Sequence, residues 1–513
     1  MLDLVTPGWR GLNLQQQGQL LSPDWCTKAE NCVIDEAHRL ACRGGYSVTT
    51  TTPIAGSHLV KSLHEYLTHT GTVQIISAWG GGISDDVASP VANDISGAVT
   101  DANGRWRFQN YNDKVIGFQH GQKPIVYSGA TFATIAESSG TAPTIHNDVG
   151  FCGFGRVWGL HSDGQTIRYS GLLDEADWGT VSAGSIDMAN IWPGGVDEVT
   201  AIAGFNNSLI VFGKNHIIIW DDIQGSKLGL DPENLIVVDT IFGTGCLSQW
   251  SVQSIGDGDL LFISRNGLQS LGRVMQERSN PVGDVSKNVR DALLTDLREL
   301  SDVDDMRSVY YPEDGSYILS LPTLGVPRSW VFNTMQAFED PDTRKMVFPV
   351  TTWDLAPNSM VVTQAGALLM GKAGVIWTYD KTTQTDNAES IAFSYNSPWL
   401  DLGEELANRL KIIKRLSAIV YASSSTTLNF KYAVDFEGED LEVIQRSVTA
   451  TTGSEFNIAE YNLDEYGGGL ALRILRVPAR GTGQYFKLKL EAAVNAGFAL
   501  QQYEIFTKIG RLA

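Results

Sequence analysis

One repeating pattern constrains this chain of 513 residues more than any other feature of its sequence. Two short runs of alternating apolar and polar residues flank a turn that contains Gly, Asn or Asp. Alternation of this kind predicts a strand with one buried face. Asn-Gly or Asp-Gly between two such runs predicts a tight hairpin, because these residues tolerate the positive φ of primed turns. Copies of the pattern occur at residues 113–128, 149–170, 199–220, 252–271, 307–321 and 360–379, with a weaker copy at 62–79.

The spacing of these copies predicts how the hairpins are arranged. They recur about every 40 to 55 residues, which is the period of a four-stranded propeller blade. One small sheet cannot bury both of its faces, whereas sheets stacked around an axis bury them and shorten the exposed edges. We therefore predict an all-β fold, with a β-propeller of six or seven blades over residues 51–385. A sandwich array of similar hairpins is the alternative.

One segment inside the predicted propeller has helical rather than alternating periodicity. Its apolar residues recur at a spacing that places them on one helical stripe, and Asp284 stands where an N-cap would be. We predict an inserted helix near residues 285–300 that packs on the propeller core; a neighbouring subunit is the alternative site. The stripe consists of Val285, Val289, Leu293, Leu297 and Leu300.

The two ends of the chain differ from the middle. The polar segment 381–390 predicts a linker, and beyond it lie strands without the blade spacing. Phe486, Leu488 and Leu490 alternate onto one face of such a strand, and the whole region predicts a C-terminal β-sandwich over residues 390–513. Residues 1–50 are Gln-rich and weakly periodic, so we expect an N-terminal arm that makes assembly contacts.

Composition and charge exclude several classes of protein. Apolar residues make up 43% of the chain and charged residues 19%, which excludes global disorder. No apolar run approaches the roughly 18 residues of a membrane span, and we expect neither a membrane anchor nor a secretory signal. The 38 Lys and Arg against 58 Asp and Glu give a net charge of −20, which disfavours tight binding of nucleic acid. Five cysteines, an odd and sparse set, are expected to be buried thiols rather than disulfides or metal ligands.

Motifs that would carry chemistry are incomplete. His64, Glu65 and His69 are spaced one residue too widely for the helical zinc motif, and their surroundings resemble a strand. The acidic turns at 256–259 and 302–305 could hold Ca²⁺ but match no twelve-residue loop, so solvated turns are the favoured interpretation. A single incomplete Asp-box-like turn at 162–166 does not indicate a sialidase. We therefore expect no catalytic residue, no metal site and no cofactor, although a pair of carboxylates of a glycosidase remains possible among so many acids.

The segment from residue 11 to residue 46 is similar to the opening of the tail hub or tail nozzle proteins of short-tailed bacteriophages (podoviruses), a family also described as packaged-DNA stabilisation proteins. Cys42 and the additional Gly44 depart from the family pattern. Segments at 168–178, 197–220, 260–271 and 397–405 resemble later parts of the family in the same order. The matching arm residues, for which we expect a structural role, include Gly11, Asn13, Asn31, Arg39, Arg43, Gly45 and Tyr46.

The resemblance implies a non-enzymatic structural protein of the virion. Such proteins form rings, usually homohexamers, that extend and close the DNA channel below the portal-adaptor protein and anchor a tail fibre, spike or needle protein. Double-stranded DNA would pass through the lumen without specific binding, and assembly would take place in the cytoplasm of the host bacterium. Movement of ordered loops would open the channel for DNA ejection. A glycan-binding or glycan-degrading propeller, and a propeller that recruits cellular proteins, are the alternatives.

Overall fold

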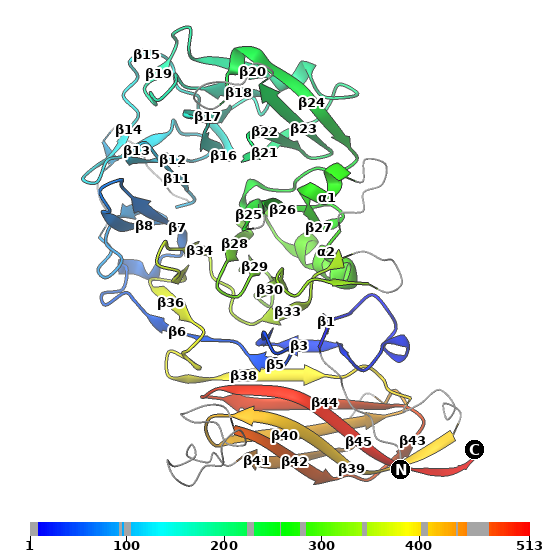
Figure 1. Cartoon of the computed structure of the whole chain (residues 1–513). Coiled ribbons are helices and arrows are strands. Elements are labelled where there is room, and N and C mark those ends of the chain that lie inside the picture. The colour runs from blue at the N-terminus through cyan, green and yellow to red at the C-terminus, as the bar shows by residue number, and fades with distance from the viewer. Residues whose placement is uncertain are drawn as a thin grey trace, which may run out of the picture.

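A computed structural model describes residues 9–91, 95–96, 104–222, 230–256, 258–276, 284–340, 346–401, 409–437, 440–448 and 471–512. Strands dominate these residues. Seven small antiparallel sheets stand around a common axis and form a β-propeller, and a two-sheet β-sandwich lies below the ring in the view of Figure 1. The predicted all-β fold of a propeller, an N-terminal arm and a C-terminal sandwich is confirmed.

The first four blades follow the hairpin pattern of the sequence. Their turns carry the positive φ that the pattern predicts; Asn206 and Asn207, with φ of 45° and 65°, connect the first two strands of the fourth blade. The strands are β7 (Val60–Leu67), β8 (Val73–Trp79) and β9 (Gly82–Ser84); β11 (Arg107–Tyr111), β12 (Lys114–Phe118), β13 (Ile125–Tyr127) and β14 (Phe132–Thr134), with β10 (Ile95–Ser96); β16 (Ile145–Gly153), β17 (Arg156–His161), β18 (Thr166–Tyr169) and β20 (Gly184–Asp187); and β21 (Val199–Phe205), β22 (Ser208–Gly213), β23 (His216–Asp222) and β24 (Leu235–Phe242).

The last three blades complete the ring. They contain β25 (Gln253–Ile255), β26 (Asp259–Ser264) and β27 (Gly267–Ser270); β28 (Arg307–Tyr311), β29 (Ser316–Leu321), β30 (Arg328–Asn333) and β33 (Val350–Trp353); and β34 (Ser359–Val362), β35 (Leu368–Gly371), β36 (Ile376–Asp380) and β6 (Gly45–Val48). Short elements between blades are the pairs β15 (Ser139–Gly140) with β19 (Asp177–Trp178) and β31 (Phe338–Glu339) with β32 (Met346–Val347), and the 3-10 turns η2 (Ala55–Ser57), η3 (Met188–Asn190), η4 (Pro232–Asn234), η5 (Gln249–Ser251) and η7 (Val303–Asp305).

The ring closes through a strand from the N-terminal segment. The inner strands contact one another in order around the axis, with η5 between β21 and β28, and β34 returns to contact β7. In the seventh blade β6 pairs antiparallel with β36, so that Tyr46 lies opposite Tyr379. The propeller therefore uses backbone from residue 45 onward. Sequence analysis had placed this strand in the arm, because its partner is more than 300 residues away and no local pattern reveals such a pair.

The predicted helix takes the place of an outer strand in the fifth blade. After β27 the chain forms α1 (Leu271–Gln276), the 3-10 turn η6 (Lys287–Val289) and α2 (Arg290–Glu299). The expected stripe of five apolar residues is buried in the chain's own core. Asp284 is not the N-cap that we predicted, because its Oδ1 accepts hydrogen bonds from the backbone N and the Oγ of Ser286, ahead of the helix.

The sandwich consists of two sheets that enclose an apolar core. Phe486, Leu488 and Leu490 are buried in it, as their alternation predicts. One sheet contains β38 (Glu389–Asn396), β44 (Phe486–Val494), β40 (Thr426–Val434) and β41 (Glu442–Val448), and the other β42 (Ala471–Pro478), β39 (Arg409–Ala422) and β45 (Phe498–Leu512), with β43 (Thr482–Gly483) paired to β39. Part of the segment that resembles the family's entry to this domain, residues 402–405, lies outside the described residues.

The N-terminal arm lies between the propeller and the sandwich of its own chain (Figure 1). Strand β3 (Lys28–Glu30) pairs with β33 of the sixth blade and with β38 of the sandwich. The hairpin of β4 (Cys32–Ile34) and β5 (Leu40–Cys42) adds to β45. The arm begins with β1 (Gly11–Leu12), η1 (Gly18–Leu20) and β2 (Trp25–Cys26). Cys26, Cys32 and Cys42 are buried free thiols, as expected.

The polar segment 381–390 connects the propeller to the sandwich, as its composition predicts, and part of it forms a strand. Its strand β37 (Thr385–Asp386) pairs with both β6 and β38. Polar side chains are retained here because one of them, Asp386, binds a buried cation, Arg43.

Candidate functional site

Arg43 is the centre of a buried polar junction between the arm, the propeller and the sandwich. Its Nη1 and Nη2 donate to the two carboxylate oxygens of Asp386 at 2.8 and 2.7 Å. Nη2 also donates to Asp354 at 3.0 Å, and Nε donates to the Oδ1 of Asn31 at 3.0 Å. Burial alone lowers the pKa of Arg43, but the hydrogen bonds and charges of Asp386 and Asp354 outweigh it and raise the pKa. The guanidinium is therefore a permanent charge that holds three parts of the chain together.

Two other signature residues are required by the backbone geometry around Arg43. Asn31 has a φ of 55° and is fully buried, and its Nδ2 donates to the backbone oxygen of Ala392 in β38 at 2.9 Å. A Cβ on Gly45 would collide with the backbone of Thr385 in β37. The neighbouring Tyr46 stacks on Trp377 with ring centroids 4.1 Å apart.

The remaining signature residues lie elsewhere in the arm. Gly11 has a φ of 83°, and a Cβ there would lie 2.6 Å from the backbone N of Val350. The Oδ1 of Asn13 accepts from the backbone N–H groups of the turn that follows it. Arg39 pairs with Asp35 at 2.7 Å. The structure thus brings Asn31, Arg43, Gly45 and Tyr46 together and leaves Gly11, Asn13 and Arg39 apart from them.

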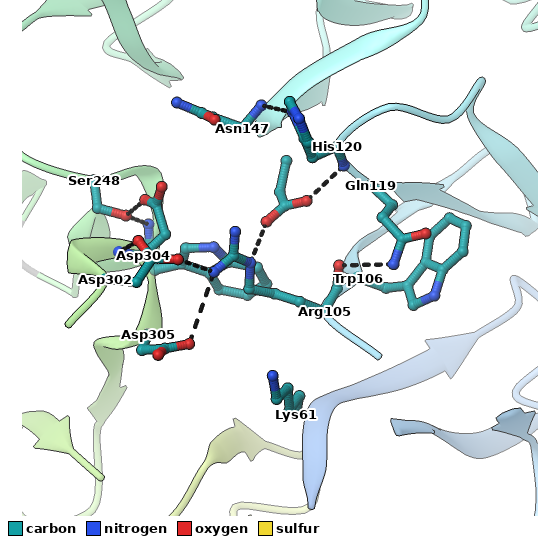
Figure 2. A network of polar contacts seen from close by, with 12 residues as sticks. Lys61, Arg105, Trp106, Gln119, His120, Asn147, Ser248, Asp302, Asp304 and Asp305 are labelled. Carbon is teal, nitrogen blue, oxygen red and sulfur yellow. Dashed lines mark hydrogen bonds and ion pairs between the residues drawn. The ribbon is translucent and has the colours of Figure 1, made fainter. Parts of the chain in front are cut away.

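A second polar cluster crosses the axis of the propeller around Arg105 (Figure 2). The Nε of Arg105, which precedes inner strand β11, lies 2.7 Å from the Oδ2 of Asp148 on inner strand β16. Its Nη1 lies 2.8 Å from the Oδ2 of Asp302 and 3.7 Å from the Oδ1 of Asp305, both ahead of inner strand β28. The other oxygen of Asp148 accepts from the backbone N of His120 at 2.7 Å. This cluster ties the second, third and sixth blades together across the ring.

The charges of this cluster stabilise one another. Burial alone lowers the pKa of Arg105, but Asp148 and the acids of η7 outweigh it and raise the pKa. Burial raises the pKa of Asp304, whose carboxylate accepts from the hydroxyl of Ser248. The acidic turn at 302–305 is partly solvated, as the sequence suggested, since the side chain of Asp302 is 49% exposed, but it also supplies counter-ions to Arg105. Sequence analysis missed this role, because the partners are 197 residues apart.

The outer edge of the fourth blade exposes apolar side chains. Strand β24 is the last strand of its sheet, and no further strand pairs with it among the described residues. Its exposed apolar side chains, which we call the β24 patch, are Ile236, Val237, Val238 and Phe242, with exposed fractions of 40%, 43%, 55% and 65%. An edge of this kind presents unpaired backbone N–H and C=O groups beside apolar surface, and such edges pair with other chains.

The metal-like motif of the sequence does not form a site. His64 is on β7, whereas His69 is exposed and hydrogen-bonds to Asp113. In the part of the chain that the structure describes, no group of three or more His, Cys, Asp or Glu side chains could hold a metal ion. Within the same residues no helix has the length and apolar character needed to cross a membrane.

Comparison with known proteins yields likenesses of shape alone. No family model matches the chain, and no curated protein matches it. The extracellular domain of a one-component system from B. thetaiotaomicron aligns with a TM-score of 0.38 and 10% identity, over 94% of this chain and 64% of that one. The WD40 β-propeller domain of Doa1 aligns with a TM-score of 0.37 and 11% identity, and streptogramin B lyase with 0.36 and 12%, each over 66% of this chain and 97% of the other. At these TM-scores the likenesses carry no argument about function.

Proposed function

We propose that this chain is a structural, non-enzymatic subunit of the tail of a short-tailed bacteriophage. In this proposal it forms the hub or nozzle ring that extends and closes the DNA channel below the portal-adaptor protein. The resemblance of the arm, from residue 11 to residue 46, suggested the family. The buried junction around Arg43 supports a structural role for that arm, because one guanidinium links it to both domains.

The observation that carries the proposal is the β24 patch. Its apolar side chains are exposed along an edge strand, and burial of about 25 cal/mol per Å² of apolar surface favours covering them. An edge strand offers backbone hydrogen bonds to a partner in addition to apolar contact. A ring of identical subunits uses heterologous interfaces, in which an edge of one copy meets a different surface of the next.

Two electrostatic features support a DNA passage in the lumen that several copies of the chain would enclose. The net charge of −20 repels the phosphate backbone, which favours sliding over binding. Within one subunit the Arg105 cluster crosses the propeller axis, so the lumen would be formed by the ring and not by the propeller. We further propose that the ring is a homohexamer in the virion, where it contacts the portal-adaptor protein and a tail fibre, spike or needle protein.

The proposal is tested by imaging the assembly. We expect the purified full-length chain, alone or with the portal-adaptor protein, to form closed rings in electron micrographs and a matching mass in light scattering. Val238→Lys in the β24 patch is expected to abolish the rings, because it places a charge in the buried interface. The matched control is Val443→Lys, since Val443 is 53% exposed on β41 of the sandwich.

Two outcomes would contradict the proposal. One is a chain that stays monomeric with every tail protein. The other is a monomer that depolymerises or binds host polysaccharide, which would favour the glycan-processing alternative.

A further inference from the structure

An axial cavity of about 480 Å³ lies among the inner elements of the first, second, fifth, sixth and seventh blades. Its lining comes from β7, β11, η5, β25, β28 and β34, and the segments next to them. Three lining residues are basic, Lys61, Arg107 and Arg307, and no Asp or Glu is among the described residues that line it. A lining whose charged residues are all basic is unexpected in a chain with a net charge of −20.

The guanidinium of Arg307 is buried, and no carboxylate of the described residues contacts it directly, although the charges of Asp148, Asp304 and Asp305 act on it. Only 4% of the residue is exposed. Its Nη1 donates to the backbone oxygens of Asp304 and Met306, both at 2.7 Å, and its Nε donates to that of Lys61 at 3.3 Å. The guanidinium also lies 4.0 Å from the ring centroid of Trp250. Among the described residues its Nη2 has no hydrogen-bond partner.

Arg107 has a similar arrangement on β11, the inner strand of the second blade. Its Nε donates to the backbone oxygen of Gly150 at 3.2 Å and its Nη1 to that of Gln249 at 3.3 Å. No described residue accepts from its Nη2 or forms an ion pair with it. Burial lowers the pKa of both Arg107 and Arg307 to about 10. A buried charge that no carboxylate contacts directly is costly, and two such arginines at one cavity make it a candidate binding site for an anion.

His64 adds a group of different character to the same lining. Burial lowers its pKa to about 4, a hydrogen bond to Asn110 acts in the opposite direction, and the charge of Arg107 lowers it further. The imidazole is therefore neutral near pH 7. Its Nε2 is buried and has no hydrogen-bond partner among the described residues. A neutral imidazole has one acceptor nitrogen, and the unpartnered Nε2 can take that role toward a bound ligand.

These groups select among anions. Arginine forks donate to oxyanions and bind them in charge-assisted hydrogen bonds. A neutral imidazole acceptor requires in addition that the anion carry a proton. Inorganic phosphate carries one near pH 7, a phosphate monoester carries one as the monoanion, below its second pKa of about 6, and sulfate carries none. The volume of the cavity is within the range of small-molecule sites, so it has room for an organic group attached to the phosphate.

We propose that the axial cavity binds a hydrogen phosphate group, as the free ion or as a small phosphate monoester. In this site Arg107 and Arg307 donate hydrogen bonds to its oxygens, and His64 Nε2 accepts a hydrogen bond from its P–OH group. The ammonium of Lys61, which has no ion-pair partner among the described residues, adds a third positive charge to the lining. The proposed site is independent of the ring assembly and makes no use of the β24 patch.

Calorimetric titration of the full chain at low ionic strength and pH 6, where both phosphates carry a proton in large part and His64 is still neutral, tests the proposal. The probes are inorganic phosphate, phenyl phosphate and sulfate. We expect saturable binding of at least one of the two phosphates, and binding of sulfate about tenfold weaker or more, since one hydrogen bond to a charged group is lost. Tighter binding of phenyl phosphate than of inorganic phosphate would identify the monoester as the ligand, and the reverse would identify the free ion.

Variants locate the site. Arg307→Gln and Arg107→Gln are each expected to weaken phosphate binding about tenfold or more. Arg446→Gln is the matched control, because it removes the same charge from exposed strand β41 and is expected to leave binding unchanged. Circular dichroism checks that each variant is folded. If Arg307→Gln does not fold, Arg307→Lys keeps the charge and removes the fork, and the same loss of binding is expected.

Several outcomes would overturn the proposal. They are equal binding of phosphate and sulfate, binding that survives Arg107→Gln and Arg307→Gln, and the absence of density between these arginines in a map recorded at saturating phosphate. Binding of oligothymidylate, with no binding of either small phosphate probe, would assign the cavity to nucleic acid instead.

Discussion

Arg43 and Asp386 are 343 residues apart in the sequence, and two parallel hydrogen bonds of 2.8 and 2.7 Å join them. The guanidinium is fully buried, whereas the side chain of Asp386 is 20% exposed. Asp386 belongs to the segment through which the chain passes from the seventh blade into the sandwich. The pair therefore fixes the start of the chain to the connection between its two domains.

Replacement of Arg43 is expected to destabilise this junction strongly. Arg43→Met leaves the carboxylate of Asp386 without the guanidinium and leaves the Oδ1 of Asn31 with only the backbone N of Asp354 as donor. Loss of one partner of a buried pair costs about 3 to 5 kcal/mol. Arg39→Met is the control, because Arg39 belongs to the same signature but pairs with Asp35 nearer the surface, and we expect about 1 kcal/mol or less. Urea unfolding followed by fluorescence measures both. Equal effects of the two replacements would contradict the role of Arg43.

The Arg105 cluster leads to a prediction about the propeller itself. Arg105→Met leaves the fully buried carboxylate of Asp148 without its counter-ion, and we expect a loss of about 3 to 5 kcal/mol. Hydrogen exchange should increase first in the second, third and sixth blades, which the cluster connects. Arg265→Met removes an exposed arginine that donates to Asn215, and a change within about 0.5 kcal/mol is expected. A propeller that tolerates Arg105→Met as well as Arg265→Met would show that the cluster does not hold the ring.

Stability at acid pH should depend on Asp197. Its side chain is 1% exposed and hydrogen-bonds to His216 at 2.8 Å and to the backbone N of Lys214 and Asn215. Burial alone raises the pKa of Asp197, but these hydrogen bonds outweigh it and hold the pKa below its ordinary value of 3.8. A depressed carboxyl pKa contributes stability that is fully present above that ordinary value and is lost as the pH falls through the value in the folded protein.

The measurement is the melting temperature between pH 7 and pH 3. The wild type should lose stability in the acid part of this range. Asp197→Asn should be less stable at pH 7, by about 2 kcal/mol, and should change less with pH. Glu437→Gln, in an exposed turn of the sandwich, serves as the control and should follow the wild type. A variant at residue 197 that retains the full acid dependence would assign that dependence to other carboxylates.

Two glycines with positive φ allow backbone strain to be separated from crowding. Gly11 has a φ of 83° and Gly243 a φ of 76°, but only at Gly11 would a Cβ approach the backbone of Val350, whereas nothing lies within 4 Å at Gly243. Gly243→Ala is expected to cost about 1 kcal/mol, from φ alone. Gly11→Ala should cost about 3 kcal/mol, because the rigid backbone must also move. Thermal unfolding measures the difference, and similar melting temperatures for the two variants would exclude close packing of the arm at residue 11.

The sequence predicted the elements that depend on near neighbours. The turn of Asn206 and Asn207 requires positive φ, which these residues adopt at low cost, so its hairpin could be recognised without any tertiary contact. The alternation of Phe486, Leu488 and Leu490 likewise identified the buried face of a strand. The helical stripe ending at Leu300 was predicted in the same way. Each of these patterns is complete within about 20 residues of chain.

Ring closure decided the rest, because it brings together residues that no local pattern relates. The pairing of Tyr46 with Tyr379, the counter-ions of Arg105 and the basic lining at Arg107 and Arg307 all join segments from different blades. A charged residue near a turn has the same local sequence whether it faces solvent or a buried partner. For that reason the sequence by itself determined the strands and the turns. It also predicted six or seven small sheets, and the propeller has seven. Only the tertiary structure decided which charges are buried, because burial depends on what the other blades place around them.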